Sequence, residues 1–155
     1  MRNFIVAGIA AAILSPFAEA NRIIELDASE MTFHQEVVVV SAGETVQFVV
    51  SNTGILAHEF VIGTVAEQEE HRKVMLAAQH QAHQGHGSRN GHHDHHDHHD
   101  GMPSITVDPG ETKSIAWTAP TADDVRLEFA CNIPGHYQAG MRGDIVIKDA
   151  IHHSS

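Results

Sequence analysis

The sequence has few basic residues, a single cysteine, and no long apolar run beyond its first twenty residues. Nine Lys and Arg stand against twenty Asp and Glu, so the formal net charge is −11 at pH 7. Without a basic stripe to neutralise phosphates, the chain is not expected to bind nucleic acid. One cysteine excludes an internal disulfide, and no apolar stretch in the body of the chain can span a bilayer. A length of 155 residues with 42% hydrophobic content predicts one domain with one core rather than a multidomain enzyme.

The first twenty residues have the pattern of a secretory signal peptide. Arg2 supplies positive charge, Phe4 to Leu14 form an apolar stretch, and Ala18-Glu19-Ala20 has the small-x-small pattern of a cleavage site. A membrane anchor or a buried helix is the alternative, but the stretch is shorter than the roughly 20 residues that a bilayer requires. We therefore expect cleavage after Ala20, export to a periplasm, and a single mature domain over residues 21–155.

From Arg22 onward, short β-branched or aromatic runs alternate with turn residues, which predicts an all-β antiparallel sandwich or barrel. Eight strands are expected: Ile23 to Leu26, Val37 to Val40, Thr45 to Val50, Glu59 to Ile62, Ser104 to Val107, Lys113 to Trp117, Arg126 to Ala130 and Asp144 to Lys148.

The β pattern is interrupted over residues 64–103, which we interpret as an insert between two strands. Thr64 and Glu67 form a capping box, and Val65 to Gln81 is rich in helix-forming residues. His92 to Asp100 then reads His-His-Asp three times and cannot build a core, so a mobile loop is expected. Because the insert joins two strands at an edge, replacing Glu67 to Gly101 with a short linker is expected to leave the fold and the core metal site intact.

The most specific chemical signal is Cys131, His136 and Met141, spaced Cys-x4-His-x4-Met between the last two predicted strands. A thiolate, an imidazole and a thioether, joined by a second histidine, suit a redox-active copper ion. His58 is the candidate, because it opens a predicted strand. Each residue taken alone has a simpler reading, Cys131 as a buried small side chain and Met141 as core packing. Zinc is disfavoured because structural zinc sites rarely use a thioether.

The segment Phe129-Ala-Cys-Asn-Ile-Pro-Gly-His-Tyr-Gln-Ala-Gly-Met141, followed by Arg142 to Ile147, resembles the ligand loop and last strand of cupredoxins, the type 1 or blue copper proteins. The loop is most similar to those of rusticyanin-like and azurin-like members. The resemblance implies a Greek-key β-sandwich with His58, Cys131 and His136 as equatorial copper ligands and Met141 as the axial one. Glu59 stands where many cupredoxins have an Asn that ties the two ligand loops together. The export signal and the His-rich insert resemble the copper-tolerance cupredoxins of the CopI type.

An enzymatic role is not expected. The neighbours of the cysteine are Ala130 and Asn132, so the flanking histidines that relay electrons in multicopper oxidases are absent from the sequence. One-electron exchange with a redox partner protein of unspecified identity is the expected chemistry. Apolar residues near His136 could provide its docking surface or merely seal the end of the sandwich: Ile133, Pro134, Tyr137 and Ala139.

The insert is also rich in histidine, and imidazoles beside Asp residues can bind additional, exchangeable Cu or Zn ions. The candidates are His71, His80, His83, His86, His92, His93, His95, His96, His98 and His99. A solvated linker is the simpler alternative. The leading hypothesis is a periplasmic copper protein that contributes to copper tolerance by binding copper and cycling its redox state. The alternatives are electron transport between respiratory partners and non-redox metal buffering or chaperoning by the histidine-rich loop.

Overall fold

The computed structural model describes residues 22–84, 101–122 and 125–149. For residues 82–84 it describes the backbone alone. The predicted signal peptide, its cleavage site and the His-His-Asp tract lie outside the described residues.

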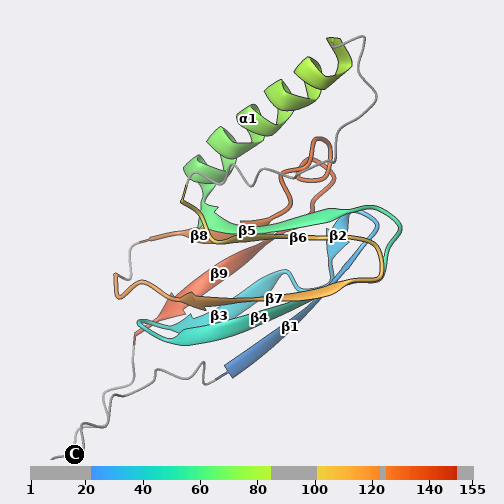
Figure 1. Ribbon diagram of the computed structural model, residues 1–155. Coiled ribbons are helices and arrows are strands. Elements are labelled where there is room, and N and C mark those ends of the chain that lie inside the picture. Colours follow the sequence, from blue (N-terminus) through green and yellow to red (C-terminus); the bar gives the residue numbers. More distant parts are fainter. Residues whose placement is uncertain (1–21, 85–100, 123–124, 150–155) are drawn as a thin grey trace, which may run out of the picture.

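Two β-sheets face each other across a common core (Figure 1). The four-stranded sheet has the order β2-β1-β4-β7, and the five-stranded sheet has the order β3-β9-β8-β5-β6. The strand bounds are β1 Arg22–Ser29, β2 Thr32–Phe33, β3 Val37–Ser41, β4 Thr45–Asn52, β5 His58–Thr64, β6 Ser104–Val107, β7 Thr112–Thr118, β8 Leu127–Ala130 and β9 Arg142–Lys148. The prediction of an all-β sandwich is confirmed, but not every pairing is antiparallel as expected: β1 pairs with β4, and β3 with β9, in parallel. The pattern missed the two-residue β2, which is too short to produce an alternation.

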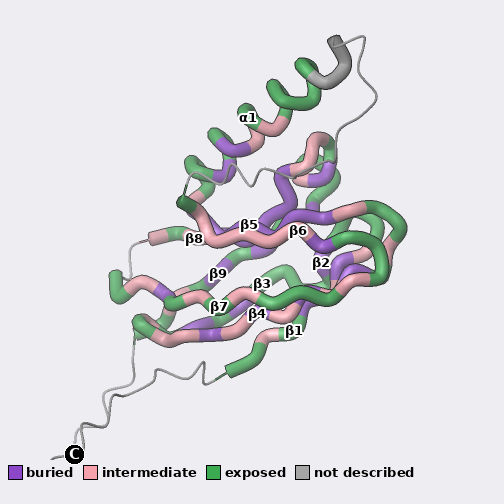
Figure 2. The backbone as a smooth tube through the Cα atoms, viewed as in Figure 1, coloured by how far each residue is buried: buried purple, intermediate pink, exposed green. Residues whose placement is uncertain are grey.

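Side-chain alternation explains why these segments form a sandwich. In β4, buried and half-buried positions alternate strictly, with Val46, Phe48 and Val50 directed into the core. In β5, six consecutive residues from His58 to Gly63 are buried, because β5 lies within its sheet and helix α1 covers its outer face. Figure 2 shows this continuous buried stretch through β5.

Aromatic rings join the two sheets at the centre of the core. Phe33 packs edge-on against Phe60 and Phe129, with ring centroids 5.9 and 5.4 Å apart. Phe48 of the opposite sheet lies 5.1 Å from Phe60. Gly143 of β9 is required beside this cluster, because a Cβ there would lie 2.2 Å from the Phe129 ring.

The insert begins with helix α1, Val65–Gln84, slightly longer than predicted. The capping box forms as expected: the Thr64 N–H donates to a Glu67 carboxylate oxygen at 2.7 Å, and the Glu67 N–H donates back to Thr64 Oγ1 at 3.3 Å. The helix projects from the end of β5, and beyond its first turns it is largely exposed (Figures 1 and 2). After the insert, the chain re-enters the sheet as β6, which pairs with β5 at the edge of the sheet. This is the arrangement expected for an insertion at an edge.

Among the described residues, no helix is both long enough and apolar enough to cross a membrane.

Candidate metal centre

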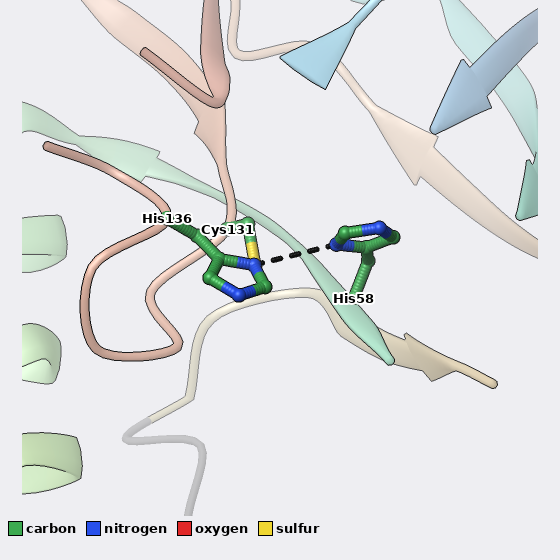
Figure 3. Close-up of side chains that lie close together, drawn as sticks. All are labelled: His58, Cys131 and His136. Atoms are coloured by element: carbon green, nitrogen blue, oxygen red, sulfur yellow. Dashed lines mark hydrogen bonds between the residues drawn. The ribbon is translucent and has the colours of Figure 1, made fainter. Parts of the chain in front are cut away.

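Three buried side chains from distant parts of the chain converge at one end of the sandwich. The Nδ1 atoms of His58 and His136 lie 3.3 Å apart, and Cys131 Sγ lies 3.4 Å from His136 Nδ1 (Figure 3). The three donor atoms all lie within 4.8 Å of one another. Metal–nitrogen and metal–sulfur bonds of about 2.0–2.3 Å place donors roughly 3–4 Å apart around one ion. The donor set therefore fits a single soft or borderline metal such as copper.

His58 is held at the first residue of β5 by the turn that precedes it. Asn52, buried at the end of β4, donates from Nδ2 to the carbonyl of Leu56 at 2.7 Å and to that of Val107 at 2.9 Å. Its Oδ1 accepts from the N–H of Gly54 at 2.9 Å. The Asn52 side chain thus holds the turn that leads to His58. His58 itself is held by its antiparallel pairing with Val107 of β6.

The loop from Cys131 to Met141 closes on itself through backbone hydrogen bonds. The Cys131 N–H donates to the Met141 carbonyl at 3.0 Å, and the Met141 N–H donates to the His136 carbonyl at 3.1 Å. Gly135 and Gly140 have φ values of 96° and 104°, a left-handed conformation that favours glycine. Met141 is completely buried in the core cluster. These bonds join the backbone of the predicted axial residue directly to two predicted equatorial residues.

Burial keeps the imidazoles neutral and the thiol protonated while the site is free of metal. Burial, reinforced by the neighbouring His136, lowers the pKa of His58, and burial also lowers the pKa of His136. Burial raises the pKa of the Cys131 thiol to about 11. Neutral imidazoles are ready to bind metal, whereas the cysteine must release its proton to do so.

Glu59, which stands at the position of the usual Asn, connects the two ligand segments. Its N–H donates to Cys131 Sγ at 3.3 Å, and its Oε2 accepts from the Asn132 N–H at 3.3 Å. Its Oε1 lies 3.0 Å from His71 Nε2 of α1. The side chains of Glu59 and His71 are almost fully buried. Glu59 in place of Asn therefore still links the two ligand loops, and it also links them to helix α1.

A second buried contact joins α1 to the ligand loop. Asn132 Nδ2 donates to Gln68 Oε1 at 2.6 Å, and Gln68 Nε2 donates to the carbonyls of Val61 and Glu128 at 2.9 and 3.3 Å. These contacts argue against the expectation that the helix of the insert is independent of the core site, which a replacement of the insert would test. His71, grouped with the candidate metal-binding histidines of the insert, is almost fully buried with its Nε2 directed to Glu59, which favours a structural contact for this residue.

The polarity of these helix residues explains why the sequence did not reveal them. Gln68, His71 and Arg72 have the i, i+3, i+4 spacing of one helix face. A face of such polar residues is normally solvent-exposed, and only the packing of α1 on β5 and β8 turns it inward.

The predicted apolar docking residues differ in their surroundings. Tyr137 is covered by guanidinium groups, with Arg72 and Arg142 lying 3.6 and 4.6 Å from its ring centroid. Its hydroxyl donates to the Glu128 carboxylate at 3.0 Å. Ile133 and Pro134 are half-buried, whereas Ala139 is exposed. Two further apolar residues that no sequence motif marks, Ile55 and Leu56, precede His58 and are 79% and 39% exposed.

Most histidines of the insert lie outside the described residues. His80 is exposed on α1. The side chain of His83 lies outside the described residues, as do His86, His92, His93, His95, His96, His98 and His99.

Comparison with known proteins links this geometry to copper. The family described as copper binding proteins, plastocyanin/azurin family, matches residues 20–148. The copper-resistant cuproprotein CopI of Pseudomonas aeruginosa is 41% identical over an alignment of 144 residues, covering 84% of this chain and 78% of that protein. The protein of the same name from Vibrio cholerae is 38% identical over 130 residues, covering 82% of this chain and 66% of that protein.

Solved structures match the fold. Auracyanin from Roseiflexus castenholzii has a TM-score of 0.60 and 21% identity, covering 83% of this chain and 97% of that one. An azurin from Methylomonas sp. strain J has a TM-score of 0.61 and 16% identity, with coverages of 83% and 99%.

Proposed function

Because the chain belongs to the plastocyanin/azurin family of copper-binding proteins, as a cupredoxin of the CopI type, we propose that it holds one type 1 copper ion. His58, Cys131 and His136 are the equatorial ligands, and Met141 is the weak axial ligand. The convergence of three buried donor atoms within 4.8 Å of one another carries this proposal. A bound copper ion would supply one-electron chemistry by alternating between Cu(I) and Cu(II).

The chain's own residues would prepare this chemistry by fixing the ligands and excluding water. His58, Cys131 and Met141 are at most 1% exposed, and His136 is 6% exposed. Backbone bonds within the ligand loop and the Asn52 contacts limit how far the donors can move. A site that moves little needs little rearrangement on gaining or losing an electron. We propose one-electron exchange, without an enzymatic turnover, as the redox role of the site.

Copper tolerance is the physiological role we propose. The relatives from Pseudomonas aeruginosa and Vibrio cholerae are called copper-resistant cuproproteins, and their similarity extends over most of this chain. We propose that the mature protein acts in a periplasm after removal of residues 1–20, where it binds copper and cycles its redox state. The His-rich residues would add weak, exchangeable Cu or Zn sites.

The visible spectrum after addition of Cu(II) to the purified protein tests the site. An intense thiolate-to-copper charge-transfer band is expected, and a colourless copper form would instead favour a non-redox buffer acting through the histidines. A gene deletion tests the role: copper sensitivity is expected, whereas a respiratory defect in copper-poor medium would favour a dedicated electron carrier.

A further inference from the structure

We propose that the first turns of α1 are part of the metal centre, and that Glu59, His71, Gln68 and Asn132 act as positioning residues for the copper ligands. This inference rests on the proposed copper site. It assigns a role to a helix that belongs, by sequence, to the insert.

Glu59 is the central residue of this buried polar network. Its backbone N–H reaches the sulfur of Cys131, and its carboxylate reaches the backbone N–H of Asn132, the next residue in the ligand loop. The same residue follows His58 directly in the chain. A shift of the Glu59 side chain would therefore be transmitted to two ligands from separate segments.

His71 restrains that side chain from the helix. Its Nε2 lies 3.0 Å from Glu59 Oε1, and the two residues are 2% and 3% exposed. A buried carboxylate requires a partner, because burying it alone is costly. The direction of the carboxylate thus depends on the position of α1.

Gln68 and Asn132 provide a second connection one helical turn earlier. Gln68 is fully buried, donates to β5 and β8, and accepts from the side chain of Asn132. Arg72 adds a longer contact, with a guanidinium nitrogen 3.4 Å from Asn132 Oδ1. The helix is therefore attached to the residue beside Cys131 through buried amide groups.

These contacts point to positioning rather than to stability alone. Groups that orient metal ligands typically change metal affinity by about 10–100-fold when they are removed. The two connections meet at the backbone N–H and the side chain of Asn132. Loss of either connection should consequently alter the orientation of the Cys131 sulfur and with it the electronic spectrum of bound copper.

Paired substitutions in the full mature chain test the proposal. Glu59→Gln replaces the carboxylate with an amide of nearly the same volume, and Glu70→Gln is its control because Glu70 is an exposed glutamate on α1. Gln68→Ala removes the buried amide, and Gln79→Ala removes an exposed one. The measurements are the Cu(II) visible spectrum, the reduction potential, copper affinity by chelator competition, and thermal unfolding of the metal-free protein.

We expect Glu59→Gln and Gln68→Ala to shift the band and the potential and to weaken copper binding by about 10–100-fold. Both controls should remain within about twofold of the wild-type affinity. Unfolding temperatures that fall while the spectrum, potential and affinity stay at wild-type values would mean a purely structural role and would overturn the inference.

His71 offers an internal check through a conservative change. His71→Gln retains a side-chain N–H that can donate to Glu59, whereas His71→Ala does not. We expect the Gln variant to be closer to wild type in spectrum and potential, and equal shifts in the two folded variants would contradict the proposal. If His71→Ala does not fold, the spectrum, potential and affinity of Glu59→Gln test the positioning role instead.

The wild-type protein tests the copper site itself. If it shows no charge-transfer band, the proposed copper site is refuted, whereas a wild-type band with unchanged variants refutes only the positioning role.

Discussion

The Nδ1 atoms of His58 and His136 lie 3.3 Å apart although 78 positions separate the two residues in the chain. Two neutral imidazoles can share only one hydrogen between facing nitrogens, so at least one lone pair remains directed into the site. With the Cys131 sulfur beside them, these atoms form a preorganised set of metal donors.

Cys131→Ser should abolish the intense visible band. Only the deprotonated sulfur supplies the thiolate-to-copper transition, and a hydroxyl of similar size cannot replace it. Absorption spectroscopy of the Cu(II)-treated variant measures this. Ser114→Ala is the control, because Ser114 is exposed on β7 in the other sheet. A Ser variant that keeps the band would show that the sulfur ligand has been assigned wrongly.

Met141→Gln should retain copper while shifting its reduction potential and spectrum. The axial ligand tunes the metal more than it holds it, and the backbone bonds from Met141 to Cys131 and His136 do not depend on its side chain. Voltammetry of the variant beside the wild type checks this. An unchanged potential would remove Met141 from the ligands.

Copper affinity should rise with pH over the neutral and mildly alkaline range. Because burial raises the pKa of the Cys131 thiol to about 11, metal binding below that pH must release the thiol proton. One released proton corresponds to an increase of about tenfold in apparent affinity per pH unit between about pH 7 and pH 9. The lowered pKa values of His58 and His136 mean that their protons compete little in this range. Chelator competition at several pH values measures the slope, and a slope near zero would indicate that the thiol is already ionised in the free site.

Two replacements of the insert should have different effects. A short Gly/Ser linker in place of residues 85–100 leaves α1 and β6 in place, and changing loop length costs only about 0.6 kcal/mol per doubling. Replacing Glu67 to Gly101 also removes Gln68 and His71, whose contacts reach Glu59 and Asn132. We expect the visible band to survive the shorter replacement and to change or disappear in the longer one. Identical wild-type spectra from both would show that α1 does not contribute.

The shorter replacement should also lower the number of additional weakly bound Cu or Zn ions. In the intact protein this extra binding should fade as the pH falls through about 6.5, the ordinary pKa of histidine, because protons then displace the metal. Metal titrations of both proteins at two pH values measure it, and equal stoichiometry would mean that the histidine tract stores no metal.

Asn52→Ala should destabilise the metal-free protein by about 2–3 kcal/mol, because it leaves buried backbone groups of the turn before His58 without their partner. Urea unfolding measures the change. Ser51→Ala, which removes an exposed hydrogen bond to Thr112, should stay within about 0.5 kcal/mol of wild type. A similar loss in both variants would mean that the turn is not held by Asn52.

Local sequence patterns were enough to predict the sandwich. The alternation of Val46, Phe48 and Val50 in β4 follows from the two-residue period of a strand. The start of α1 was predicted because the Thr64–Glu67 capping box is a local arrangement. The candidate ligands Cys131, His136 and Met141 were visible because they lie in one short loop.

Only the tertiary structure decided what surrounds those ligands. His58 and His136 meet because their strands and loop are brought to one end of the sandwich, a contact that no local pattern encodes. Gln68 and His71 belong to a polar stretch of the insert, yet they are buried against Glu59, Asn132 and neighbouring strands. The physical reason is that polarity predicts burial only on average, whereas a polar side chain becomes stable inside a protein when another segment supplies its hydrogen-bond partner. Those partners lie up to 64 positions away in the chain, and only folding brings them within reach.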